Sequence, residues 1–194
     1  GLDFKTGGTI GKPVRALADG YISRIRVTNG SGYVLDVCYH NGYSTINRHL
    51  SAFLSPIADR VKKLQYENEN WEVEIIPEPD EYPVKAGQRI ALSGNTGYSF
   101  GPHLHLDVFE TETGDYIDPM PFFKKNLKDT RAPKADGIML FPQLGKGVVS
   151  GSQENKTILP NSEHPVEAWG VIGTGIKAYD YMDGVNNHYG VYSV

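Results

Sequence analysis

The sequence is poor in cysteine, in basic charge and in long apolar runs, and each shortage removes a class of protein. Its 194 residues include a single cysteine, Cys38, so no disulfide framework can form within the chain. Acidic residues outnumber basic ones by 23 to 19, which argues against nucleic acid or an anionic membrane surface as the main partner. No run approaches the roughly 20 apolar residues that cross a bilayer, so we expect no transmembrane segment in this chain.

What is present favours a mainly β protein. Glycine occurs 22 times and proline 12 times, and short strand-like runs alternate with turn-forming residues. The Asn-Gly pairs at 29–30 and 41–42 predict hairpins that join residues 14–28, 32–40 and 43–50 into an antiparallel meander. Residues 55–70 are the exception, because an early proline and apolar residues at helical spacing predict one short helix there.

A change of composition divides the chain in two. Residues 120–137 are basic and contain proline, which is typical of a linker. We therefore predict a first domain over residues 1–123, a linker over 124–136 and a second domain over 137–194. The β-type runs of the second domain, the last at 188–194, predict a partial immunoglobulin-like β-sandwich that lacks its final strands. Since the chain opens without methionine and ends on a strand pattern, we interpret it as a piece of a longer protein, with any targeting segment lost.

Two of the six histidines stand one residue apart in the run FGPHLHLDVFE, residues 100–110. On a strand, side chains two apart share a face, so His103 and His105 project together while Leu104 and Leu106 face the other way. Two histidines on the wet face of a half-buried strand are the ordinary alternative. Zinc needs about four ligands, so the pair indicates a metal site only if further suitable groups come to the same place.

The other histidines divide by context. His49 ends a strand of the predicted meander, where the next segment turns away. His40, His164 and His188 lie near turns and are expected outside any site. Cys38 in mid-strand, and Ser93 and Ser99 in a glycine-rich turn, lack the surroundings of a catalytic nucleophile.

Five landmarks follow one another in an order that resembles a known family. They are GLDF at 1–4, GKPVRALADG at 11–20, RHLS at 48–51, VKAGQRIALSGNTGYSFGPHLHL at 84–106 and YIDP at 116–119. Over about residues 1–120 this series resembles the lysostaphin-type zinc metallopeptidases, also called LytM-like peptidoglycan endopeptidases.

The resemblance implies a zinc site and a division of labour among the histidines. In the family, a His-x-Gly-x-Asp motif and the second histidine of His-x-His hold the metal, which makes Asp3 and His105 ligands here. The first histidine of that motif falls two positions before Gly1. We expect this further ligand upstream of Gly1; the alternative is that the natural protein lacks it. His103 and His49 are then the catalytic histidines, with His103 activating the zinc-bound water and His49 orienting it and stabilising the tetrahedral oxyanion. No substrate-binding residue is identified.

These implications lead to an expected function and to one alternative. We expect a zinc-dependent endopeptidase that hydrolyses amide bonds in peptidoglycan stem peptides or cross-bridges, in the periplasm, in the cell envelope or outside a bacterium. The alternative is a non-catalytic relative that acts as a wall-binding scaffold or as an activator of amidases. Retention of Asp3, His49, His103 and His105 argues against that alternative, because a scaffold needs none of them.

Three features depart from the family pattern. Asn47 stands where a tyrosine is usual, which we expect to alter substrate contacts. Asp107 replaces a common glutamate, and it either fixes an imidazole tautomer or is an ordinary exposed aspartate. Residues 53–83 look inserted, and they either shape specificity along the substrate groove or form a wall without substrate contact. The acidic run from Glu67 to Glu81 within them is either a solvated rim or a patch that attracts amines.

Overall fold

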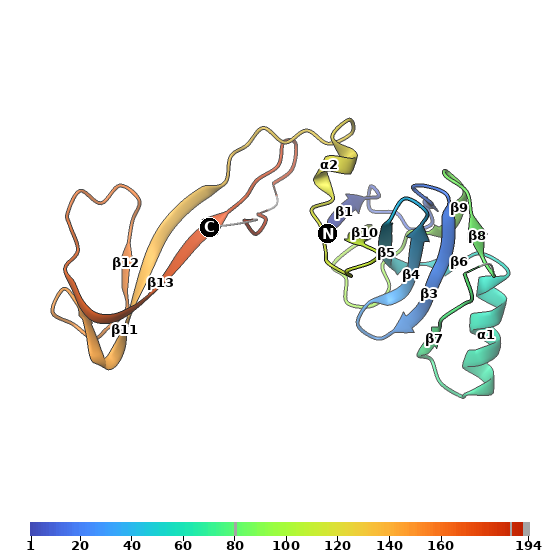
Figure 1. Ribbon diagram of the computed structural model, residues 1–194, viewed down its shortest axis with the longest axis horizontal. Coiled ribbons are helices and arrows are strands. Elements are labelled where there is room, and N and C mark those ends of the chain that lie inside the picture. Colours follow the sequence, from blue (N-terminus) through green and yellow to red (C-terminus); the bar gives the residue numbers. More distant parts are fainter. Residues whose placement is uncertain (80, 187, 192–194) are drawn as a thin grey trace. The chain divides into compact units, whose positions relative to one another are not determined.

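The computed structural model describes residues 1–79, 81–186 and 188–191, and the chain divides into two compact units, Gly1–Phe123 and Lys124–Val194 (Figure 1). Both units are built mainly from antiparallel strands, which confirms the expected fold class. The elements of the first unit are β1 (Leu2–Lys5), β2 (Pro13–Arg15), β3 (Gly20–Thr28), β4 (Gly32–Tyr39), β5 (Tyr43–Leu50), β6 (Ala52–Phe53), α1 (Ile57–Glu67), β7 (Val73–Ile75), β8 (Pro83–Val84), β9 (Arg89–Leu92), β10 (His103–Glu110) and α2 (Met120–Phe123).

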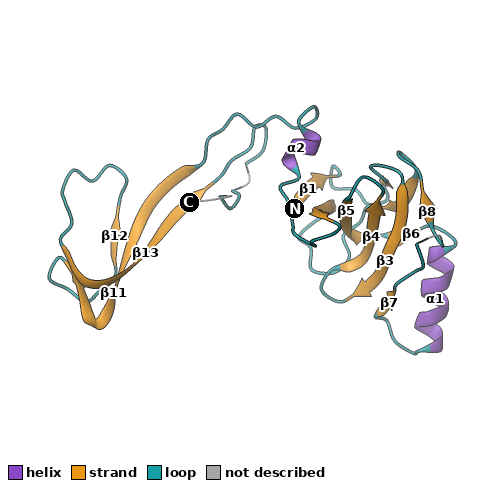
Figure 2. Cartoon of the chain, viewed as in Figure 1, coloured by secondary structure: helices purple, strands orange, loops and turns teal. Residues whose placement is uncertain are grey.

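The larger sheet of the first unit has the strand order β1-β10-β5-β4-β3-β7, with β8 also paired to β3. The meander β3-β4-β5 confirms the predicted hairpins, since β3 and β4 pair from Gly20↔Tyr39 to Thr28↔Gly32. Strand β1 pairs with β10, which comes about a hundred residues later, and this sets Asp3 directly opposite His105. Figure 1 labels β1, β10 and β5 next to one another, and Figure 2 shows how strands predominate over helices in the chain.

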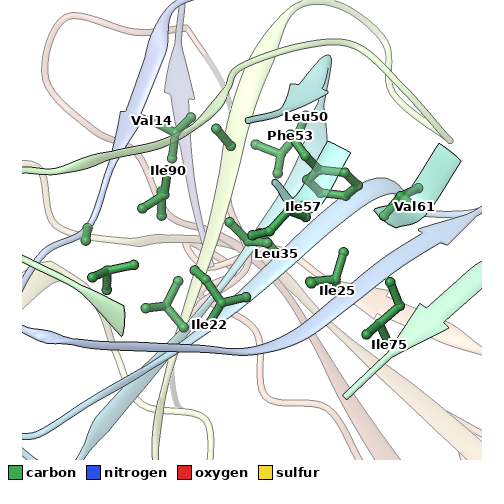
Figure 3. Packing of buried hydrophobic residues seen from close by; sticks show 14 of the residues in the cluster. Val14, Ile22, Ile25, Leu35, Leu50, Phe53, Ile57, Val61, Ile75 and Ile90 are labelled. Carbon is green, nitrogen blue, oxygen red and sulfur yellow. The ribbon is translucent and has the colours of Figure 1, made fainter. Parts of the chain in front are cut away.

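The hydrophobic core lies on one face of this sheet. It is covered by a small antiparallel sheet, β2-β9-β6, and by α1 (Figure 3). Helix α1 buries Ile57 and Val61 in that core, as its helical spacing predicted. Leu35 and Leu50 are fully buried beneath the covering elements. Each such side chain contributes roughly 1.5–3 kcal/mol through removal of apolar surface from water.

Core packing at Leu35 can be tested by truncation. We expect Leu35→Ala to lower the free energy of unfolding by about 2–5 kcal/mol, because the cavity adds to the lost burial. Leu17→Ala is the matched control, since Leu17 is 49% exposed whereas Leu35 is 0% exposed, and it should cost less than about 1 kcal/mol. Urea unfolding followed by circular dichroism measures both values. Equal losses would contradict the assignment of Leu35 to the core.

The opposite face of the sheet is polar. Leu106 and Val108 of β10 are buried and Leu104 packs against the core, so His103 and His105 project from the other side, as strand alternation predicted. Asn47 faces the core side instead: it is 2% exposed, and its amide donates to the Leu35 carbonyl oxygen. The amide of Asn47 is therefore not placed to contact a substrate itself, and the expectation that its replacement of a tyrosine alters substrate contacts stays a prediction.

The short helix α2, at the end of the first unit, packs against β1 and β5. Phe123 of α2 packs edge-on against Phe4 of β1, with ring centroids 5.1 Å apart. Phe122 packs in the same way on Tyr43 of β5, at 5.2 Å. These contacts hold the outer strand β1 against the rest of the sheet, and Asp3 lies on that strand.

The segment 53–83 provides α1 and the edge strand β7. Three acidic side chains of its run pair with basic groups of the same unit: Glu67 with Lys63, Glu74 with Arg24 and Glu81 with Arg60. This internal pairing favours the solvated rim over a patch that attracts amines. Whether the segment shapes specificity stays a prediction.

The second unit contains one three-stranded antiparallel sheet with the order β12-β11-β13. Its strands are β11 (Lys134–Val149), β12 (Lys156–Ile158) and β13 (Ala168–Tyr179). Strand β11 begins three residues before the predicted domain start at 137, because its backbone pairs with β13 from Lys134 onward. Within the described part of this unit no second sheet faces the first, so the β-sandwich stays a prediction.

The end of the chain is only partly described. Residues 192–194 of the strand expected at 188–194 lie outside the described residues. Tyr189 forms an isolated bridge with Asp180. Among the residues that the structure describes, no helix is long and apolar enough to cross a membrane.

Candidate metal centre

Four residues that the sequence singled out come together on the polar face. Asp3 comes from β1, His49 from the end of β5, and His103 and His105 from β10. Asp3 Oδ1 lies 2.7 Å from His105 Nδ1 and 3.6 Å from His103 Nε2. The His49 ring lies 4.9 Å from the His103 ring and 6.1 Å from the His105 ring, between centroids. His103 and His105 are therefore not a chance surface pair, because other suitable groups meet them.

His105 lies between two carboxylates. Its Nε2 is 3.1 Å from Asp107 Oδ1, and its Nδ1 faces Asp3. Hydrogen bonds to Asp107 and then to Asp3 raise the pKa of His105 to about 9, against the opposing effect of burial. Near neutral pH and without a metal, both ring nitrogens therefore carry protons and donate to the carboxylates. A metal that binds at Nδ1 has to displace one of these protons.

Asp107 is buried and fully engaged. It is 7% exposed, and its Oδ2 accepts a hydrogen bond of 3.0 Å from Arg48 Nε. Burial alone raises the pKa of Asp107, but the hydrogen bonds and charges of His105 and Arg48 outweigh it and hold the pKa well below the ordinary value. Asp107 is thus the acceptor that fixes an imidazole, and not the ordinary exposed aspartate that the sequence also allowed.

His49 has an unusual backbone and one fixed ring nitrogen. Its φ is 59°, in the left-handed region that non-glycine residues seldom occupy. Its Nδ1 lies 2.9 Å from the Thr96 carbonyl oxygen, which can only accept, so Nδ1 carries the proton. Burial is the main cause that lowers the pKa of His49, with the charges of His103 and His105 acting in the same direction. His49 is therefore neutral near pH 7, with its Nε2 lone pair available.

His103 has the same tautomer for the same reason. Its Nδ1 donates to the Gly101 carbonyl oxygen at 2.8 Å, and the Ser99 hydroxyl lies 3.3 Å away. In the neutral ring the lone pair is therefore on Nε2, on the side of the ring that faces Asp3. Two histidines whose Nδ1 atoms are held by backbone carbonyls, next to a carboxylate and a third histidine, are suited to moving protons.

Thr96 fixes the loop that orients His49, and the sequence analysis missed this residue. Its hydroxyl donates to the Leu50 carbonyl at 2.6 Å and accepts from the Tyr33 amide at 3.0 Å. The adjoining Gly97, at φ 72°, lies so close to the 30–32 turn that a Cβ would be 2.3 Å from the Gly32 nitrogen. The only sequence clue to this packing is the glycine on either side of Asn95 and Thr96.

The donor set fits a zinc ion. Asp3, His103 and His105 each offer one ligand atom, and these atoms lie within 4.8 Å of one another. Carboxylate oxygen and imidazole nitrogen are ordinary zinc ligands. His105 also has its second nitrogen on a buried carboxylate, as histidines that bind metals usually do. Geometry alone thus admits His103 as a ligand, whereas the resemblance makes it a catalytic group.

Comparison with known proteins points to one group of enzymes, although no family model matches the chain. Over 130 residues the chain is 35% identical to the glycyl-glycine endopeptidase ALE-1 of Staphylococcus capitis, covering 64% of this chain and 28% of that protein. Over 108 residues it is 35% identical to the peptidoglycan DD-endopeptidase ShyB of Vibrio cholerae, covering 56% of this chain and 20% of that protein. It thus spans less than a third of these curated relatives.

One solved structure is also similar in sequence to the chain. The catalytic domain of the antimicrobial peptidase lysostaphin from Staphylococcus simulans is 30% identical to the chain, with a TM-score of 0.44. The match covers 62% of this chain and 74% of that domain. The aligned region thus includes most of that catalytic domain.

Proposed function

The chain belongs to the lysostaphin-type metallopeptidase family, and from this membership we propose that it is a zinc-dependent endopeptidase of peptidoglycan. The bonds that it hydrolyses are amide bonds in stem peptides or cross-bridges. Relatives named as a glycyl-glycine endopeptidase and as a peptidoglycan DD-endopeptidase support the substrate class. The observation that carries the proposal is the meeting of Asp3, His49, His103 and His105 on one sheet face.

Asp3 and His105 would hold the zinc, together with a histidine two positions before Gly1. If β1 continues toward the N-terminus, that position shares the face of Asp3, since it lies four residues away along a strand. When bound, zinc supplies Lewis-acid chemistry: it polarises the scissile carbonyl and lowers the pKa of a water.

The protein residues handle the protons. In its neutral form His103 has its lone pair on Nε2 beside Asp3, so it can take the proton of the attacking water and return it to the leaving amine. His49, neutral and held through Thr96, orients the water by accepting a hydrogen bond at its Nε2 and, once Nε2 has taken a proton from solvent, stabilises the oxyanion. Asp107 keeps His105 in place while this occurs.

The location follows from the substrate. Peptidoglycan lies outside the cytoplasmic membrane, so we place the protein in the periplasm, in the envelope or outside the cell. We assign the catalysis to residues 1–123. The scaffold alternative is not favoured, because Asp3 contacts His103 and His105, the His49 ring lies beside both, and a scaffold has no need of that arrangement.

The test is digestion of purified peptidoglycan. The chain, extended by its natural upstream residues, is incubated with zinc and peptidoglycan, and released fragments are identified by mass spectrometry beside a His103→Ala control. We expect new amine termini in the peptide portion, and these identify the bond. No cleavage of several wall types by folded protein that has bound zinc would overturn the proposal.

Zinc affinity should depend on pH through His105. Because the pKa of His105 is raised to about 9, a proton occupies the metal-binding nitrogen at lower pH. We expect the affinity to rise about tenfold per pH unit from about pH 7 and to level off above about pH 9. Competition with a chelator at several pH values, corrected for the chelator's own protonation, measures this slope. A flat profile would contradict the proposed role of His105.

A further inference from the structure

We propose that Arg48 and Asp107 form a positioning pair, which holds His105 by Nε2 so that Nδ1 faces Asp3 and can bind the metal. This inference rests on the proposed zinc site and adds two residues to it. Neither residue would touch zinc or substrate; both would act through His105.

Strand register brings the three side chains together. Arg48 on β5 is directly opposite His105 on β10, and Asp107 is two residues further along β10. All three therefore lie on the polar face of the sheet. Placement on two central strands, rather than on loops, fixes their backbones.

The carboxylate of Asp107 is held at both oxygens. Oδ1 faces His105 Nε2 at 3.1 Å, and Oδ2 accepts from Arg48 Nε at 3.0 Å. Rotation of the carboxylate would break both contacts at once. Arg48 is fixed in turn, because its Nη1 donates to the Ser31 hydroxyl at 3.2 Å.

The chain of contacts continues to the other side of the site. Ser31 lies in the β3-β4 turn, and its carbonyl oxygen accepts from the His49 amide at 3.2 Å. Ser31 thus joins the Arg48 side chain to the backbone of His49. The Arg48–Asp107 pair and His49 are therefore connected through the same turn residue.

The backbone of β1 also fits against the pair. A Cβ at position 1 would lie 2.4 Å from Asp107 Oδ1 and 2.7 Å from His105 Nε2. Only glycine leaves this space free. The glycine two residues before Asp3 therefore has a packing reason: it lets β1 approach while His105 keeps its contact with Asp107.

The contact between Asp107 and His105 should strengthen metal binding at His105 Nδ1. A carboxylate that accepts from Nε2–H selects the tautomer with an Nδ1 lone pair and makes that nitrogen more basic. Loss of such a partner typically costs 10–100-fold in metal affinity. We expect a loss of that size for Asp107→Asn, and a smaller loss for Arg48→Gln, because Asp107 would remain but could rotate.

The chain offers a matched control on the same face. Asp36 of β4 is 6% exposed and accepts two hydrogen bonds from Arg26, at 2.7 and 2.8 Å. Ile46 of β5 is the cross-strand neighbour of both Asp36 and Asp107. Asp36→Asn therefore makes the same change in a similarly buried Asp–Arg pair that does not contact His105.

The test is zinc affinity of the chain with its natural upstream residues, by competition with a chromophoric chelator at one pH. We expect Asp107→Asn to weaken zinc binding by 10–100-fold, Arg48→Gln by less, and Asp36→Asn by less than about threefold. Asp107→Glu should recover part of the loss, and ¹⁵N spectra of the zinc-loaded protein should show the His105 proton on Nε2. Thermal unfolding of each variant identifies losses due to misfolding, and Arg48→Gln decides the question if Asp107→Asn does not fold.

Equal zinc affinities for the Asp107 and Asp36 variants, or unchanged affinity in Arg48→Gln, would overturn the inference. Wild-type protein that binds no zinc would overturn both this inference and the proposed function. Wild-type protein that binds zinc but cleaves no peptidoglycan would overturn only the proposed function. The zinc measurement uses no peptidoglycan, so the two failures are distinguishable.

Discussion

His103→Ala is expected to lower the rate of amine release from peptidoglycan by about 10²–10⁴-fold while zinc stays bound. The structure gives the reason: Nδ1 of His103 is committed to the Gly101 carbonyl, so Nε2 is the atom free to accept a proton beside Asp3. Removal of the imidazole removes the proposed base without removing Asp3 or His105. The rate on purified peptidoglycan and the zinc affinity of the same preparation are the two measurements.

The same experiment decides between two roles for His103. Its ligand atom belongs to the cluster within 4.8 Å that includes Asp3 and His105, so a ligand role is geometrically open. Near wild-type zinc affinity together with lost activity supports the catalytic role. Loss of zinc affinity as large as in a ligand variant would make His103 a ligand instead. His40→Ala, at an exposed histidine in a turn outside the cluster, is the control and should change neither quantity.

His105→Ala is expected to abolish zinc binding at the zinc concentrations that saturate the wild-type protein, and activity should be lost with it. The loss of affinity should exceed the 10–100-fold typical of a residue that only supports a ligand, because a ligand itself is removed. Asp3 and Asp107 would also lose the imidazole that donates to both of them.

Chelator competition measures the affinity, and amine release measures the activity. Asp3→Asn should follow the same pattern, since Asp3 is the other proposed ligand in the chain. His105→Ala protein that binds zinc within tenfold of wild type would contradict the ligand assignment. Unfolding curves in the presence of chelator separate loss of metal from loss of fold.

Much of the first unit follows from local sequence. The Asn-Gly pairs correctly predicted the β3-β4 and β4-β5 hairpins, because such pairs favour tight turns between antiparallel strands. Helical spacing correctly predicted α1. Strand alternation correctly placed His103 and His105 opposite the core.

Other parts of the site depend on contacts between distant segments. The pairing of β1 with β10 brings Asp3 to His105, and nothing in either strand alone specifies this register. The left-handed backbone of His49 and its bond to Thr96 require the packing of two loops. The burial of Asn47 also depends on a neighbouring strand, because its amide donates to the Leu35 carbonyl there. The proposed role of Arg48 could not be predicted from the sequence, because it depends on the strand register that sets Arg48 opposite His105.

The second unit shows a different limit. Its strand-like runs predicted strands, and β11 and β13 are present. A β-sandwich requires a second sheet whose apolar face packs on the apolar face of the first. The described residues of this unit form one sheet. The sequence pattern could not fix that arrangement.

The most direct test of zinc-dependent peptidoglycan hydrolysis is a metal titration on the substrate itself. The chain with its natural upstream residues is stripped by a chelator, dialysed, and assayed on purified peptidoglycan as zinc is added back. We predict no release of amine termini without zinc and recovery that saturates at about one zinc per chain. Full cleavage by the stripped protein, or none at any zinc concentration by folded protein, would contradict the account.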